Sequence, residues 1–390
     1  MELLQSFFDF EFGNIHKVVL WTFGLAIIFG AVVAKTNFCT MGAISDWVNM
    51  GDKGRFRAWM LATGIAIVGS QILQANVEHV NLTKSIYLSM NFGWLGALFG
   101  GFTFGVGMTL GSGCGQRTLV RVGMGNIKSL IVMVTLGIFA LMTLTGFIAL
   151  FRINWVEKAN IDLTESFAMK NQGFSDLLMK IFPFENIATA QWILAAIFGG
   201  GLILFAILNS DFRKNFNNIL AGVTIGLVII GGWYITGALG FDDFEPIRLE
   251  SFSFVAPIGN SINYLTTFTG STINFGIAAV LGVIAGAFLY AIFSGNFRWE
   301  HFTSRNDLFS QITGGALMGV GGVLSLGCTI GQGVTGMSTL AMGSLLALVA
   351  IIYGCALTMK VQYYMIDGQK FFSALGSALK DLMTFKMMTT

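Results

Sequence analysis

Charged side chains are scarce in this sequence. Asp, Glu, Lys and Arg make up 11% of its 390 residues, whereas soluble domains carry about 25%. Hydrophobic residues make up 54%, and repeated apolar runs reach the roughly 20 residues that cross a bilayer. The net charge of +2 includes no basic patch with interleaved aromatics, which argues against a nucleic-acid partner. The composition predicts an all-α polytopic protein of the lipid bilayer.

Histidine and cysteine are too few and too dispersed for a metal site. The three histidines fall at predicted helix ends or loops, and the four cysteines form neither a CxxC motif nor a Cys/His cluster. Nothing resembles a nucleotide-binding loop or a Ser/His/Asp arrangement. We therefore expect no metal, no cofactor, no enzymatic activity and no use of ATP by this chain. The cysteine count alone does not exclude a disulfide.

About nine apolar segments are expected to span the membrane within a single transport domain, residues 1–390. They cover residues 18–34, 58–75, 92–110, 127–150, 190–209, 219–239, 273–294, 307–324 and 343–362. The acidic opening segment, residues 1–13, has no basic n-region or cleavage site, so we expect no removable signal peptide.

Lysine and arginine gather on one side of this topology. With nine crossings, that side receives Lys53, Arg55, Arg57, Arg213, Lys214, Arg298, Arg305, Lys360, Lys370, Lys380 and Lys386. By the positive-inside rule, the N-terminus is outside and the C-terminus cytoplasmic. The opposite side receives the connection 151–189, in which FSDLLMKIFPF is typical of an interfacial amphipathic helix. Residues 363–390 would form an amphipathic cytoplasmic tail.

A glycine-rich segment occurs twice. GGFTFGVGMTLGSGC (100–114) and GGALMGVGGVLSLGC (314–328) match at eight of fifteen positions, and FGAVVAKTNFCTMGA is a weaker third copy. The glycines before each cysteine are typical of closely packed membrane helices. Five predicted spans lie between the first two copies, so these copies would enter the membrane from opposite sides.

This inverted-topology repeat divides the chain. We expect a first repeat over residues 1–150, a loop and connecting helix over 151–218, and a second, inverted repeat over 219–362.

Each copy ends in a composition that breaks a helix. GSGCGQ and LGCTIGQG combine closely spaced glycines with Gln and Thr. We expect broken or re-entrant half-helices there, whose N-termini face a cavity near the membrane midplane and favour an anion. A thiol at such a break fits a functional group better than an inert core residue, whereas Cys355 lies on a continuous helix and fits the inert interpretation.

Polar side chains near the breaks leave alternatives open. Arg117 and Arg121 would either add positive charge beside an anion path or lie at the cytoplasmic interface as positive-inside residues. Asp46, after the first break, would cap a helix, pair with a nearby arginine or face the cytoplasm.

The motifs KTNFCTMGAISDW, GGFTFGVGMTLGSGCGQ and GGALMGVGGVLSLGCTIGQG, in this order, resemble the YeeE/YedE sulphur-transport family of bacterial inner membranes. The resemblance implies a thiosulfate permease-like protein of the bacterial inner membrane. It also implies that Cys39, Cys114 and Cys328 line an hourglass-shaped constriction and pass thiosulfate along by thiol hydrogen bonds. Some members act with a TusA-like sulphur-carrier protein. The arginines of GSGCGQRTLVR depart from the family pattern and leave the choice of sulfur or selenium oxyanion open.

We therefore expect import of thiosulfate or a closely related sulfur-containing anion, with the three cysteines as successive contacts. The other expected binding residues are Gly113, Gly115, Gln116, Arg117, Gly327, Thr329, Gly331 and Gln332. The alternatives are transport of another sulfur or selenium species, and a membrane thiol or persulfide relay that delivers sulfur to a cytoplasmic carrier. A purely structural scaffold is the least consistent with the paired breaks.

Overall fold

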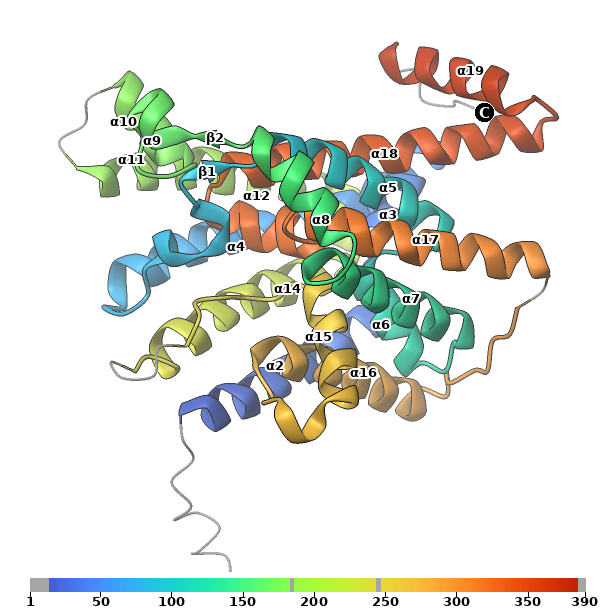
Figure 1. The fold of residues 1–390 in the computed structure, drawn as a ribbon, viewed down its shortest axis with the longest axis horizontal. Helices are drawn as coiled ribbons and strands as arrows, with labels where there is room; N and C mark the ends of the chain where they lie inside the picture. The colour runs from blue at the N-terminus through green and yellow to red at the C-terminus, as the bar shows by residue number, and fades with distance from the viewer. Residues whose placement is uncertain (1–13, 183–185, 243–246, 303, 385–390) are drawn as a thin grey trace, which may run out of the picture.

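The computed structural model describes residues 14–182, 186–242, 247–302 and 304–384. Long α-helices dominate these residues (Figure 1), and the strands are one short antiparallel pair, β1 (Asn91–Phe92) and β2 (Ile161–Asp162). The opening segment 1–13, where no signal peptide was expected, lies outside the described residues.

Eight helical stretches are long and apolar enough to cross a membrane. They are α2 (Asn14–Thr36), α4 (Gly54–Asn76), α5 (Gly101–Leu110) with α6 (Gly115–Gly123), α7 (Ile127–Leu144), α11 (Ile187–Leu194) with α12 (Gly201–Ile207), α14 (Phe216–Tyr234), α16 (Phe275–Phe293) and α18 (Met342–Ile366). Each overlaps one expected span. The ninth expected span is helix α17 (Arg305–Leu324), which packs between α5 and α7. It needs less hydrophobicity because it contacts protein on both sides.

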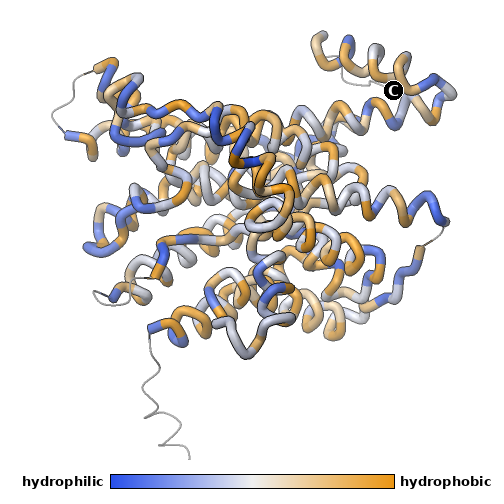
Figure 2. Tube along the Cα trace, viewed as in Figure 1, coloured by the Kyte–Doolittle hydropathy of each residue, from blue (hydrophilic) through white to orange (hydrophobic). Residues whose placement is uncertain are grey.

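Polar residues lie largely at the left and right ends of the long helices, and apolar residues lie between them (Figure 2). The first described helix, α2, begins at the left, and α18 ends at the right near the C-terminus (Figure 1). The apolar band is the part of the molecule that matches a bilayer.

The long helices pair in a pattern that relates the two halves of the chain. Helix α2 packs on α16 and α4 on α14, while α7 packs on α17 and α5 on α18. In chain order, α2, α4, α5 and α7 of the first half correspond to α14, α16, α17 and α18 of the second half. When each helix is replaced by its counterpart, every one of these pairs becomes another of the four pairs. Helices α5 and α17, which carry the two copies of the glycine-rich segment, also contact each other.

The repeated glycines make matching close contacts. A Cβ on Gly105 would lie 2.3 Å from the Ile351 carbonyl oxygen, and one on the matching Gly319 would lie 2.5 Å from that of Leu136. These glycines let the backbones of α5 and α18, and of α17 and α7, approach directly. The sequence interpretation of these residues as packing glycines is confirmed.

Two features between α14 and α16 were not anticipated. The chain after residue 246 runs as an extended segment that buries Phe252 and Phe254, whose rings lie beside Phe29. It then forms helix α15 (Val255–Thr266), which packs against α7 and α16. Both place backbone that is not part of a long helix next to the breaks at Cys114 and Cys328.

Two predicted amphipathic segments form helices. Helix α10 (Phe174–Ile181) covers most of FSDLLMKIFPF, whose Pro183 and Phe184 lie outside the described residues. Helix α19 (Phe371–Met383) packs Ala374 and Ala378 against α18.

A buried cation ties this last helix to the body of the protein. The Lys360 side chain on α18 is 2% exposed, and its Nζ lies 3.2 Å from Asp381 Oδ2 on α19. The Tyr364 hydroxyl donates a hydrogen bond to the same carboxylate oxygen.

Candidate functional site

The chain adopts the same local conformation before each of three cysteines. Asn37, Ser112 and Leu326 have φ angles of 54°, 56° and 59°, in the left-handed region that ends a helix. Each lies two residues before a cysteine. The next helix then begins directly after Cys39, Cys114 or Cys328. The expected helix breaks are therefore present in all three motifs, including the weaker first copy.

Two of these thiols cap the helix that follows them. Gly42 N–H donates to Cys39 Sγ at 3.5 Å, and Gly331 N–H donates to Cys328 Sγ at 3.4 Å. In both cases the donor lies three residues after the cysteine, where an N-cap side chain reaches a free backbone N–H. The third cysteine, Cys114, also occupies the N-cap position.

The thiols of the three motifs are brought together inside the protein. Cys39 and Cys114 lie close enough for their side chains to interact, and Thr329, next to Cys328, lies near the Cys114 thiol. Cys114 and Cys328 are fully buried and Cys39 is 6% exposed. All four cysteines are free thiols. Cys355 lies apart from this series and receives a hydrogen bond of 3.3 Å from Thr109 Oγ1.

A cavity of about 600 Å³ reaches the Cys328 break from the side where α2 begins. We call it the N-side cavity. Gly327, Leu326 and Ser253 line it near the thiol, while Arg248 and Glu250 are its charged residues among those described. Burial raises the pKa of Glu250 to about 7, and the nearby Arg248 opposes this shift.

A second cavity, of about 400 Å³, reaches the Cys39 break from the opposite side. We call it the basic basin. Its charged lining residues among those described are Lys35, Arg117, Arg121, Arg298 and Glu300. Arg117 donates to Asn37 Oδ1 at 2.8 Å, and Arg121 donates to the carbonyl oxygen of Ser112 at 2.8 Å. Both arginines therefore contact the left-handed residues of the breaks and line the wall of this cavity.

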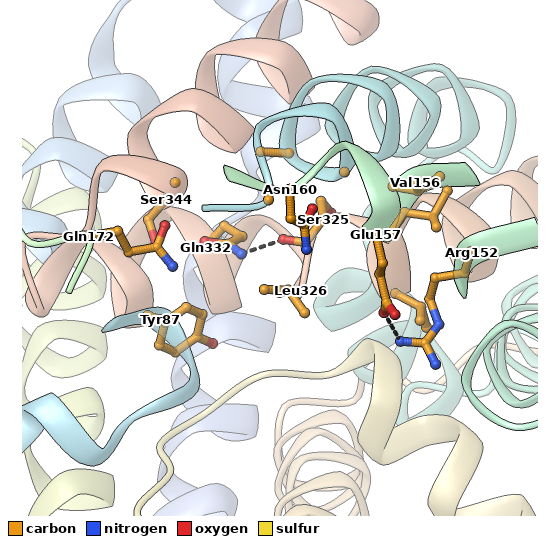
Figure 3. A pocket seen from close by; sticks show the side chains of 16 residues that line it. Tyr87, Arg152, Val156, Glu157, Asn160, Gln172, Ser325, Leu326, Gln332 and Ser344 are labelled. Atoms are coloured by element: carbon orange, nitrogen blue, oxygen red, sulfur yellow. Dashed lines mark hydrogen bonds and ion pairs between the residues drawn. The ribbon is translucent and has the colours of Figure 1, made fainter. Parts of the chain in front are cut away.

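The two glutamines use their amide nitrogens to fix the breaks. Gln116 Nε2 donates to the Phe38 carbonyl oxygen at 3.1 Å, and Gln332 Nε2 donates to that of Ser325. Their Oε1 atoms are buried and have no hydrogen-bond partner among the described residues. Gln332 lines a small cavity of about 80 Å³ with Tyr87, Gln172 and Ser344 (Figure 3). None of the three cysteines lines this cavity in the described part of the chain.

The other predicted site residues surround the breaks. Gly327 lines the N-side cavity, whereas a Cβ on Gly113 would lie 3.3 Å from the Arg117 side chain. Gly331 faces the Ser253 hydroxyl, which a Cβ there would approach to 2.5 Å. A Cβ on Gly115 would meet only ordinary contacts of 3.8 Å or more.

Sequence reasoning missed residues that loops bring to the site. Ser253 belongs to the extended segment before α15, and Tyr87 lies in the connection between α4 and α5; the hydroxyls of both lie beside Gly331, three residues after Cys328. Neither residue lies in a motif or in a copy of the glycine-rich segment, so no signal in the sequence pointed to this role. The question about Asp46 is settled in favour of pairing, because both its carboxylate oxygens accept from Arg55.

Comparison with known proteins agrees with this arrangement. The sulphur transport family model matches residues 35–357, a range that contains all three cysteine breaks. A thiosulfate transporter of Escherichia coli K12, TsuA, is 26% identical over 338 residues, which cover 84% of this chain and 90% of that protein. A thiosulfate transporter TsuA of Spirochaeta thermophila is 27% identical over 342 residues, covering 86% and 97%. With eight membrane-length helices and a family match over most of its length, this chain belongs to the sulphur transport family.

Proposed function

We propose that this protein is an inner-membrane permease for thiosulfate, and that Cys328, Cys114 and Cys39 are its successive contacts. One observation carries the proposal: buried cysteines stand at three helix breaks, and one cavity reaches the Cys328 break while another reaches the Cys39 break from the opposite side. Both similar proteins described above are named thiosulfate transporters.

The chemistry of the path suits this substrate. Thiols are weak hydrogen-bond donors, so they hold the diffuse terminal sulfur of thiosulfate loosely enough for it to move on. The oxyanion end would be held by backbone N–H groups at the breaks. Thr329 beside Cys114 supplies a hydroxyl at the middle of the series. Sulfate has no terminal sulfur, so the thiols give the path its selectivity.

We also propose the direction and the internal division of the protein. The side with the basic basin and α19 would be cytoplasmic, because the positive-inside rule places lysine and arginine there. Residues 1–150 and 219–362 would be the two inverted repeats, joined by 151–218, and 363–390 would be the tail. The exchange relation among helix pairs supports this division. A TusA-like carrier would receive sulfur on the cytoplasmic side.

Uptake of ³⁵S-labelled thiosulfate tests the proposal. Cells that depend on this protein for external thiosulfate are compared with cells that carry Cys114→Ala, Cys114→Ser or Cys355→Ala. We expect uptake to fall to background with Cys114→Ala and to stay near the wild-type rate with Cys355→Ala, since Cys355 lies outside the series. Equal uptake by the wild type and by a variant with all three path cysteines replaced by alanine would refute the assignment.

A second experiment, on protein purified from these cells, distinguishes transport from a persulfide relay. A relay requires a covalent sulfur adduct on a path cysteine, which mass spectrometry of the purified protein would detect after exposure to thiosulfate. A permease leaves the cysteines unmodified while label accumulates inside. Excess unlabelled sulfate should not compete for uptake, whereas unlabelled thiosulfate should.

A further inference from the structure

The basic basin holds more positive charge than the protein neutralises. Four cationic side chains line it, Lys35, Arg117, Arg121 and Arg298, against the single carboxylate of Glu300. The described lining therefore carries a net charge of +3. Like charges in one cavity repel each other unless an anion joins them.

The basin cations have no ion-pair partner among the described residues. Among the described residues, salt bridges join Arg55, Lys128, Arg152 and Lys360 to carboxylates, and none involves a basin cation. The Glu300 carboxylate instead accepts a hydrogen bond from Asn126. The charge of the basin is thus available to a ligand.

Arg117 points to the kind of ligand. Its Nη2 donates to Asn37, but its Nη1 is buried and has no hydrogen-bond partner among the described residues. A buried guanidinium N–H without an acceptor is costly, and the planar fork of arginine matches two oxygens of an oxyanion. The lining contains no thiol among the described residues, so nothing in it distinguishes a terminal sulfur from an oxygen.

We propose that the basic basin is a binding site for small dianionic oxyanions that is separate from the thiol path and less selective than it. The anion site itself does not depend on the proposed function; only the effect on transport, described next, rests on it. Thiosulfate that leaves Cys39 would enter this site, and other dianions on the same side, such as sulfate, would compete for it. Their accumulation would then slow release of the transported anion, so the basin would reduce uptake when the compartment is rich in sulfur oxyanions.

Direct binding of sulfate tests the site without relying on transport. The protein is placed in nanodiscs of zwitterionic lipid, and equilibrium binding of ³⁵S-sulfate is measured for the wild type and three sets of variants. With Arg117→Gln/Arg121→Gln, affinity should fall about tenfold or more. The matched control Lys214→Gln, which removes an exposed charge outside the basin, should bind as the wild type does. The triple Cys39→Ala/Cys114→Ala/Cys328→Ala variant should also keep its sulfate binding.

Absence of saturable sulfate binding in the wild type, or unchanged binding in the double arginine variant, would overturn the inference. Arg298→Gln, at an exposed position, provides a second test that does not depend on the folding of the double variant, and it should also weaken binding. Nanodiscs that contain phosphatidylglycerol distinguish a free anion from a lipid headgroup. Sulfate binding that disappears there at constant ionic strength would assign the basin to lipid and overturn the free-anion site.

Proteoliposomes then test the consequence for transport. Sulfate loaded on the basin side should slow thiosulfate uptake by the wild type and have less effect on the double arginine variant. If sulfate does not slow thiosulfate uptake, the proposed effect of the basin on transport is wrong and the permease function stands. If sulfate binds but the protein takes up no thiosulfate, the basin is still an anion site and the permease function is wrong.

Discussion

Replacement of Gly105 by alanine offers a test of the packing that holds the two halves together. The added Cβ would lie 2.3 Å from the Ile351 carbonyl oxygen and 2.8 Å from the backbone nitrogen of Cys355, where ordinary contacts measure 3.4–4 Å. Both neighbours are backbone atoms of α18, so no side-chain rotation relieves the clash. Helices α5 and α18 must separate by about 1 Å, which also loosens the contact at Gly101 nearby.

The expected cost follows from two opposing terms. Overpacking of a core costs about 1–3 kcal/mol, and a clash with backbone belongs at the upper end of that range. Alanine recovers up to about 1 kcal/mol of helix propensity relative to glycine. The net destabilisation is about 2 kcal/mol, or a loss of about 4 °C in the temperature of half-unfolding. Gly319→Ala, with its Cβ 2.5 Å from the Leu136 carbonyl oxygen, should behave alike.

The control is Gly24→Ala on α2, because a Cβ there meets nothing within 4 Å. It gains helix propensity without a clash and should be neutral or slightly stabilising. Heating in detergent followed by fluorescence-detected size-exclusion chromatography ranks the variants, and a fixed heating time is needed because unfolding of such proteins is irreversible. If Gly105→Ala loses no more native protein than Gly24→Ala, the reasoning from backbone contact is wrong.

Three other substitutions give separable expectations, each measured by the same heating assay. Asp46→Asn should destabilise the folded protein by about 1–3 kcal/mol, because it breaks a largely buried ion pair with Arg55 whose guanidinium keeps partial solvent contact. The same substitution should cost much less stability in an Arg55→Gln background. Equal losses in the two backgrounds would refute the pairing. The folded protein binds a proton at Glu250 more tightly than the unfolded chain does, since its pKa rises from 4.5 to about 7. Stability should therefore fall as pH rises from about 4.5 to 7, and Glu250→Gln should remove that part of the pH dependence. Leu326→Gly should stabilise the folded protein by up to about 1 kcal/mol, because the half-exposed Leu326 has a left-handed φ of 59° that glycine adopts without strain. A marked loss of stability would show that the contacts of the leucine side chain matter more than its backbone strain.

Much of the fold could be predicted because hydropathy and glycine spacing are local signals. The expected span at 58–75 corresponds to α4, Gly54–Asn76, and the span at 273–294 to α16, Phe275–Phe293. Helix α15 could not be found in this way. It has 12 residues, contains Pro257 and is too short to cross a bilayer.

The site was predictable only as far as the repeat extends. Matching cysteines in repeated breaks pointed to the three thiols, and the family resemblance implied that they line one constriction. Tyr87 and Ser253 reach Cys328 from connecting segments without a repeat, so tertiary packing alone places them there. The placement of Arg117 in a cavity wall also depended on the structure, because a positive-inside arginine and a path-lining arginine look the same in sequence.

The pairing of Lys360 with Asp381 bears on how the protein is made. The lysine enters the membrane with α18, but its carboxylate partner is 21 residues further along the chain. Helix α19 therefore supplies a carboxylate to a lysine that is buried on the preceding membrane helix. Removing α19 would take away that carboxylate and expose the apolar face on which Ala374 and Ala378 pack, so a chain shortened before Phe371 should accumulate in the membrane to a lower level than the full chain.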